Sequence, residues 1–284
     1  MDQFSINMTL LPNLEERVST EVRSNYEKIK KALDLFYTPL FFTYVGVFPE
    51  YLNYLTDQLV ANLQNPKFNT LIKETKEKIY SLIKSILFKS EEIQDWLNRY
   101  ENSPSFYNFQ KDLEKIFTVN LKLVFIFIAL REALKGWAVA AKKLPASNIS
   151  SGRLETPSTK DKDFIFEDAL VLLPSTRFQG SPDLAQSEKR AIEKDLLPRY
   201  IFLCQQEFNQ LMKKEEFLIL RGGIEKIILS TLPLMPEKIV SPINIFYKLN
   251  EKYRDFPDLL YLMSEHFPTL AVQKMMFSGF MKNS

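Results

Sequence analysis

The scarcity of glycine constrains the fold of this chain more than any other feature of its sequence. Only 7 of the 284 residues are glycine, whereas an average usage of about 7% would give about 20. β-Sandwiches, β-barrels and phosphate-binding loops use glycine in their tight turns, because these turns need a positive φ. The composition therefore predicts an all-α fold.

The periodicity of apolar residues agrees with that prediction. Helical spacing of apolar side chains predicts a first helix over residues 15–35, and Pro49 is expected to open another helix at its first turn. The stretch Phe117–Ala141 is apolar on nearly all faces, which is typical of a central, buried helix. We expect two helical repeats, 1–144 and 187–284, joined by a connector loop over 145–186 that is rich in Ser, Thr and Pro at its start.

The two predicted repeats resemble each other. When Pro49 is aligned with Pro198, Tyr51 meets Tyr200 and a series of apolar positions coincide. A duplication would let the two repeats pack about a pseudo-twofold axis into one compact unit. The alternative is that any two pairs of amphipathic helices share this spacing.

The composition also excludes several classes of chemistry. The chain has one cysteine, Cys204, and one histidine, His266, so a disulfide framework, a thiolate zinc site and a His-based catalytic triad lack their parts. We expect neither a metal nor a cofactor. The 37 Lys and Arg residues nearly balance the 35 Asp and Glu residues, which argues against a nucleic-acid partner.

No segment has the character of a membrane span or a secretory signal. The longest strictly apolar run, Leu123–Leu130, is far short of the roughly 18–20 residues that a span requires. Met1–Asn13 lacks the basic start and apolar core of a secretory signal. A cytoplasmic location is therefore expected, and peripheral membrane binding through the aromatic stretch Leu35–Phe48 is a less favoured alternative.

Three short segments resemble a known family. They are Ser24–Ile29 and Phe48–Leu52, which are similar to a Tyr-Glu-x-Ile … Phe-Pro-x-Tyr-Leu pattern, and Asn120–Leu130, which is similar to an apolar helix led by Asn-Pro-Lys. In the last segment Leu121 replaces the proline. The pattern resembles the group I 2-haloacid dehalogenases, a family of halocarboxylic acid dehalogenases that act on both enantiomers of their substrate. The resemblance implies an Asp that activates water for direct displacement of halide from C2, with no covalent intermediate, and an Asn that helps to bind at that site.

Carried over residue by residue, the resemblance assigns the asparagine to Asn120. The aspartate falls on Asp183, in a Gly-Ser-Pro-Asp context, but Asp183 lies 15 residues before Pro198, about two helical turns further than the family pattern. Either Asp183 is the general base after an insertion, or the base is missing and the chain is a catalytically inactive relative. Arg177 is the candidate for binding the substrate carboxylate, and Phe42 and Phe127 are candidates for the apolar part of the site.

Each of these residues also has a structural interpretation. Asn120 is alternatively a helix cap or a buried amide that bonds to its neighbours, and Asp183 is alternatively an N-cap after Pro182. Arg177 is alternatively an exposed loop residue, and the two phenylalanines, Phe42 and Phe127, are alternatively core.

Two functional hypotheses follow from the sequence. The first is a hydrolytic dehalogenase-like protein that acts on a small 2-substituted carboxylic acid, with Asp183 and Asn120 as the reacting pair. The second is a non-catalytic helical protein that binds an apolar ligand or a protein partner. A homodimer is compatible with either hypothesis.

Overall fold

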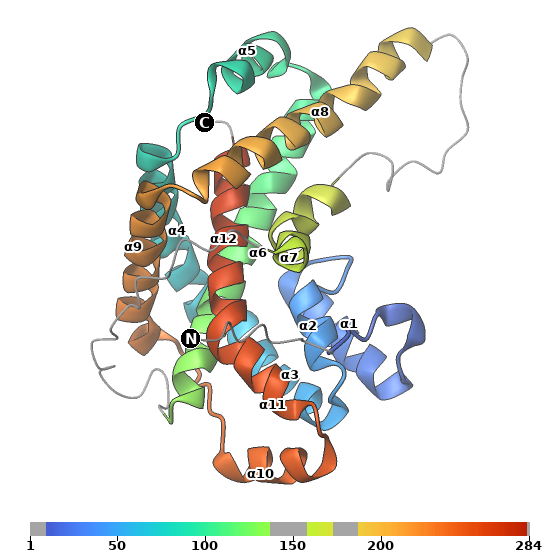
Figure 1. Cartoon of the computed structure of the whole chain (residues 1–284), viewed down its shortest axis with the longest axis vertical. Coiled ribbons are helices and arrows are strands. Elements are labelled where there is room, and N and C mark those ends of the chain that lie inside the picture. Colours follow the sequence, from blue (N-terminus) through green and yellow to red (C-terminus); the bar gives the residue numbers. More distant parts are fainter. Residues whose placement is uncertain (1–9, 137–157, 173–186, 283–284) are drawn as a thin grey trace, which may run out of the picture. The chain divides into compact units, whose positions relative to one another are not determined.

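The computed structural model of the chain describes residues 10–136, 158–172 and 187–282 (Figure 1). Within these ranges every regular element is a helix, and no strand occurs. The predicted all-α fold class is confirmed. The predicted duplication is a statement about ancestry and symmetry, and it stays a prediction.

The chain divides into two compact units, and each unit is assembled from three separate segments. Unit 1 comprises Met1–Leu71, Phe125–Pro145 and Leu229–Thr269, and unit 2 comprises Ile72–Val124, Ala146–Ile228 and Leu270–Ser284. The predicted repeats, by contrast, are continuous in sequence. That division stays a prediction.

Unit 1 is built from short and medium-length helices. These are α1 (Thr20–Leu33), α2 (Leu40–Val45), α3 (Pro49–Leu63), α10 (Ile243–Lys252) and α11 (Phe256–Tyr261). Ser19 caps α1 by accepting a hydrogen bond from the backbone N–H of Val22, and Asp34 ends the helix in the left-handed conformation with φ 57°. The predicted helix over 15–35 is therefore shorter at both ends, whereas Pro49 opens α3 as predicted.

Hydrogen bonds link α3 to the segment that precedes α10. The backbone N–H of Val240 donates to Gln58 Oε1 at 2.9 Å, and that of Glu237 donates to Asn62 Oδ1 at 3.3 Å. At the start of α3, Glu50 accepts hydrogen bonds from Lys252 and Tyr253. These contacts join parts of unit 1 that are nearly 200 residues apart in sequence.

Unit 2 holds the longer helices. It contains α5 (Glu91–Tyr100), α7 (Thr159–Val171) and α8 (Ser187–Leu211), most of α4 (Pro66–Ile86) and α9 (Glu215–Thr231), and parts of α6 (Pro104–Leu134) and α12 (Phe267–Met281). Figure 1 shows α12 lying beside α6, with α7 next to them. Two side chains anchor the end of α12, because Tyr200 Oη and Gln110 Nε2 both donate to the carbonyl oxygen of Met281, at 2.7 and 3.3 Å.

A glycine allows α12 to approach its neighbours closely. A Cβ added at Gly279 would lie 2.9 Å from Ile83 Cδ1 on α4 and 3.0 Å from Phe117 Cε2 on α6. Both of those side chains are buried, so neither has free space into which it could move. One of the few glycines of the chain is thus placed where three helices meet.

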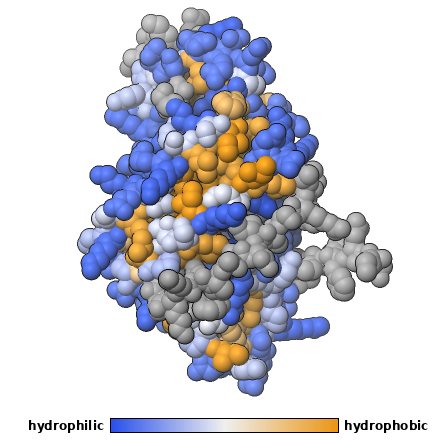
Figure 2. All heavy atoms as spheres, turned by 90° about the vertical axis from the view of Figure 1, so that its left-hand side faces the viewer, coloured by the Kyte–Doolittle hydropathy of each residue, from blue (hydrophilic) through white to orange (hydrophobic). Residues whose placement is uncertain are grey.

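On the face that Figure 2 shows, apolar side chains gather near the middle and hydrophilic side chains surround them. Phe88, Phe202 and Ile219 are among the large apolar residues that remain exposed. Within the described ranges, none of the helices combines the length and the apolar character needed to cross a bilayer.

Candidate functional site

Asn120 occupies the centre of the candidate site, on the part of α6 that belongs to unit 2. Its side chain is 1% exposed, and its neighbours Phe117, Leu121 and Val124 are completely buried. An amide placed among apolar side chains is costly unless its donors and acceptors are hydrogen bonded. The partners of Asn120 therefore decide what the site can do.

The amide nitrogen of Asn120 has two partners. Nδ2 donates to Asp168 Oδ2 at 2.7 Å and to Ser278 Oγ at 3.3 Å. Ser278 can accept because its own hydroxyl proton is donated to the carbonyl oxygen of Met275, at 2.7 Å. Since an ionised carboxylate only accepts hydrogen bonds, the contact with Asp168 fixes which end of the amide faces it.

The amide oxygen of Asn120 is different. Asn120 Oδ1 is buried and has no hydrogen-bond partner among the described residues. An unsatisfied buried acceptor costs about 1–3 kcal/mol, and a buried water with several polar partners is the usual way in which proteins avoid this cost. Asn120 therefore presents an acceptor for a donating group beside the carboxylate of Asp168.

Asp168 lies on α7, and the start of this helix is fixed by side-chain hydrogen bonds. Ser158 caps the helix in a capping box with Asp161, in which each side chain accepts a hydrogen bond from the other residue's backbone N–H. Further along α7, Phe164, Ile165 and Ala169 are buried together with Asp168. Asp168 is 3% exposed, which makes it a charged group within an otherwise apolar face.

Lys274 supplies the opposite charge from α12. Its ammonium lies 3.1 Å from Asp168 Oδ1 and also contacts Glu167, and the lysine is 1% exposed. Burial by itself lowers the pKa of Lys274, but the two carboxylates outweigh this effect, and its pKa is raised above the ordinary lysine value. Lys274 is therefore protonated at neutral pH and balances part of the negative charge.

The predicted site residues have different outcomes. Asn120 is buried and faces a carboxylate. Asp183 and Arg177 lie outside the described residues, so both stay predictions. Phe42 and Phe127 are buried in unit 1, where their ring centroids are 5.9 Å apart in a cluster with Phe41 and Phe267.

Sequence reasoning missed Asp168 and Lys274. Each is a charged residue within an apolar stretch, Asp168 in Phe164–Leu172 and Lys274 in Leu270–Phe280. That pattern was the available signal, because a charge on a buried face needs an opposite charge nearby. It could not show which acid and which base meet.

Within the ranges that the structure describes, no cluster of three or more His, Cys, Asp or Glu residues has the arrangement needed to hold a metal ion. The expectation that the chain uses no metal or cofactor stays a prediction.

Comparison with known proteins bears on the fold. No protein-family profile and no curated protein sequence matches the chain. Among solved structures, a D-2-haloacid dehalogenase in complex with L-LA matches with a TM-score of 0.66 and 13% identity, over 99% of this chain and 98% of that chain. The chain has the D-2-haloacid dehalogenase fold.

Two further structures give the same result. A D-2-haloacid dehalogenase mutant in complex with D-2-CPA matches with a TM-score of 0.65 and 12% identity, over 96% of this chain and 95% of that chain. Another mutant matches with a TM-score of 0.66 and 13% identity, over 99% and 97%. At these identities the likeness shows the fold, and the activity has to be argued from the site.

Proposed function

We propose that the chain is a dehalogenase-like hydrolase that displaces halide, or a similar leaving group, from C2 of a small carboxylic acid. The observation that carries the proposal is the pairing of Asn120 with Asp168. A buried carboxylate lies next to an amide oxygen that lacks a hydrogen-bond partner among the described residues. The fold of the D-2-haloacid dehalogenases supports the same class of reaction.

The proposed reaction uses the two residues to hold one water molecule. The water donates one O–H to Asn120 Oδ1 and the other to the carboxylate of Asp168, which leaves an oxygen lone pair directed at C2. As the new C–O bond forms, Asp168 accepts the proton, and the halide leaves with the electron pair of the carbon–halogen bond. The products are the 2-hydroxy acid, halide and one proton, which Asp168 releases to solvent.

Lys274 is a positioning residue in this scheme. Its ammonium holds Asp168 through Oδ1, while Asn120 holds Oδ2. The carboxylate is thereby fixed from both sides, which suits a base that must keep one orientation toward a small water molecule. For binding the substrate carboxylate, Arg177 remains the candidate from the sequence, whereas Phe42 and Phe127 belong to unit 1 and are not part of this pair.

The assay is halide release from racemic 2-chloropropionate. We expect turnover by the unmodified chain and a loss of about 10²- to 10⁴-fold in kcat for Asp168→Asn, because this variant keeps the shape of the side chain and removes the base. Asp163→Asn is the matched control, since Asp163 is an exposed aspartate on the same helix. Circular dichroism before each assay separates lost activity from lost folding.

Asp183→Asn distinguishes the two candidate bases. If Asp183→Asn abolishes halide release and a folded Asp168→Asn variant keeps it, the base is Asp183 and the pairing with Asn120 is structural. If the unmodified chain releases no halide from either enantiomer, the hydrolase proposal is wrong. The second hypothesis, a non-catalytic helical protein, would then explain why both oxygens of Asp168 are already bonded to protein groups.

A further inference from the structure

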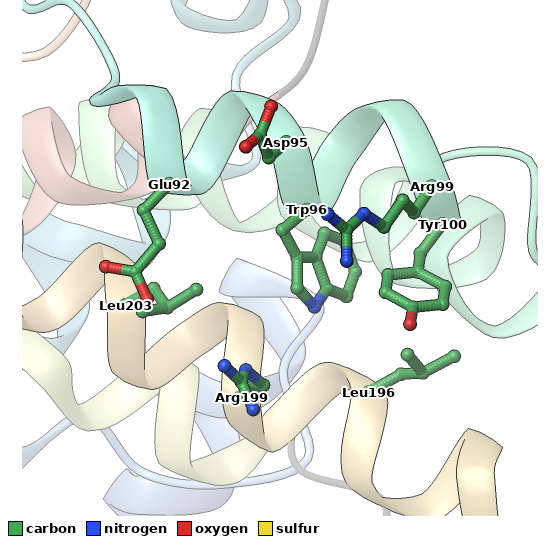
Figure 3. A pocket seen from close by; sticks show the side chains of 8 residues that line it. All are labelled: Glu92, Asp95, Trp96, Arg99, Tyr100, Leu196, Arg199 and Leu203. Atoms are coloured by element: carbon green, nitrogen blue, oxygen red, sulfur yellow. The ribbon is translucent and has the colours of Figure 1, made fainter.

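A cleft between α5 and α8, within unit 2, has the features of a second binding site. It has a volume of about 520 Å³. Asn120 and its neighbours Asp168, Lys274 and Ser278 do not line it. Figure 3 shows its side chains, with Glu92, Asp95, Trp96, Arg99 and Tyr100 coming from α5 and the others from α8.

Two arginines give one part of the cleft a positive charge. Arg99 comes from α5 and Arg199 from α8, and both are exposed. No ion pair within 4.0 Å links either guanidinium to an acid among the described residues. A guanidinium on each wall of the cleft favours a bound anion, with which it can form charge-assisted hydrogen bonds.

A buried indole N–H supplies a further donor. Trp96 is 5% exposed, and its Nε1 has no acceptor among the described residues. Figure 3 shows the indole extending from α5 toward α8, with the ring nitrogen at the end near Arg199 and Leu196. An indole can only donate, so the group that completes this site has to accept hydrogen bonds.

The rest of the cleft selects a particular kind of anion. Trp96 packs against Tyr100 with ring centroids 5.2 Å apart, and Leu196 and Leu203 add apolar surface from α8. Glu92 extends toward Leu203, on the far side of Trp96 from Tyr100, and Figure 3 shows the carboxylate of Asp95 turned away from α8. A negative charge is therefore favoured near Arg99 and Arg199 and disfavoured near Glu92.

We propose that this cleft binds a small organic acid with one carboxylate and an apolar body. The carboxylate lies between Arg99 and Arg199 and accepts the Trp96 N–H, and the apolar body lies against Tyr100 and Leu196, which also line the cleft. The site goes beyond the proposed hydrolysis, because its residues take no part in the Asn120–Asp168 pair.

Tryptophan fluorescence provides a direct test. The chain has two tryptophans, Trp96 and Trp137, so Trp137→Phe leaves Trp96 as the source of the signal. Phenylacetate is the probe, benzyl alcohol is the neutral analogue and benzylamine is the cationic one. We expect a saturable change in Trp96 emission with phenylacetate, a weaker effect at high salt, and no saturable change with the other two compounds.

Substitutions assign the binding to the cleft. In the Trp137→Phe background, Arg99→Gln and Arg199→Gln are each expected to weaken phenylacetate binding about tenfold or more, because each removes a charged hydrogen-bond donor. Arg254→Gln, at an exposed arginine outside the cleft, is the control and should bind normally. Trp96→Phe, measured by calorimetry, keeps an aromatic ring without the N–H and is expected to bind more weakly.

Three results would overturn the proposal. One is the absence of a saturable change up to about 20 mM phenylacetate, which would leave binding weaker than any useful affinity. Another is equal binding of benzyl alcohol, which would make the cleft a general apolar site. The third is unchanged affinity in both folded arginine variants. Phenyl phosphate is included as a separate probe, and preference for it over phenylacetate would also contradict the carboxylate assignment.

Discussion

At the scale of single residues, Lys274 contributes most to the candidate site. It is a lysine with 1% exposure that contacts two acidic residues, Glu167 and Asp168. A buried ion pair often adds little net stability compared with apolar residues of the same size, but removing one partner leaves a buried charge without compensation. The stability of unit 2 and the geometry of the proposed base therefore depend on the same ammonium group.

Replacement of this lysine is expected to be strongly destabilising. Lys274→Met should lower the free energy of unfolding by about 3–5 kcal/mol, because two carboxylates lose their buried counter-charge. Urea denaturation measures the effect, and Lys226→Met, at an exposed position of α9, is the control. The double variant Lys274→Met/Asp168→Asn should lose less than the sum of the two single losses. Strict additivity would contradict the pairing.

The same lysine gives a dependence on pH. Because the pKa of Lys274 is raised in the folded state, its contribution to stability is complete below the ordinary lysine pKa and is lost as the pH rises through the higher, folded-state value. The difference in unfolding free energy between the unmodified chain and Lys274→Met should therefore shrink above about pH 10.5. A difference that stays constant up to pH 12 would show that the charge of Lys274 is not what stabilises the fold.

At the scale of elements, the packing of α12 against α4 and α6 depends on the absence of a side chain at Gly279. Most glycines inside helices weaken them, because glycine loses more backbone entropy than alanine on folding. At Gly279 the absence of a side chain offsets this cost, because it lets the helices pack closely. A Cβ there would lie only 2.9 Å from Ile83 and 3.0 Å from Phe117. An alanine would raise the helix propensity but would also overpack the contact. The distance to the neighbouring side chains therefore decides whether the substitution stabilises or destabilises the chain.

Two glycine substitutions test this balance. Gly279→Ala should destabilise the chain by about 1–3 kcal/mol, because overpacking outweighs the gain in helix propensity. Gly223→Ala on α9 should stabilise it by about 0.5–1 kcal/mol, because a Cβ there would meet only Leu82 at 3.7 Å, an ordinary contact. Thermal unfolding of both variants provides the comparison. If both changes stabilise the chain, Ile83 and Phe117 leave enough space for a Cβ at position 279.

At the scale of the whole molecule, the chain is interleaved. Each compact unit is assembled from three segments of the chain. Residues of the second predicted repeat therefore form contacts with residues of the first. In unit 2, Asn120 bonds to Ser278, Gln110 bonds to the carbonyl of Met281, and Glu114 pairs with Lys282. Residues 187–284 therefore lack much of their packing surface when the earlier segments are removed.

A fragment experiment follows from this organisation. The isolated fragment 187–284 is expected to retain partial helicity but to lose cooperative unfolding, because the surfaces that α6 and α7 supply are missing and α12 is left with exposed apolar side chains. Far-ultraviolet circular dichroism during a urea titration measures this. A single sharp transition in the fragment would mean that the second predicted repeat folds independently, as a self-sufficient half.

The sequence by itself determined the helical class and several helix ends, since these depend on local chemistry. The low glycine content indicated the helical class, and the proline at the start of α3 acts within a few residues of its own position. The same local information placed Asn120 on an apolar helix. It overestimated the length of α1, which ends at Leu33 because the next residue, Asp34, has a left-handed conformation.

Only the tertiary structure decided which polar residues meet. Asp168 lies 48 positions after Asn120, and Lys274 lies 106 positions after Asp168, and no spacing rule links residues on three different helices. Their contact depends on how the buried faces of α6, α7 and α12 pack together, and Gly279 allows α12 to approach α6 closely. Burial selects such partners because a charge removed from water is stable only beside its counter-charge, a condition that the folded chain imposes and that the linear order of residues does not contain.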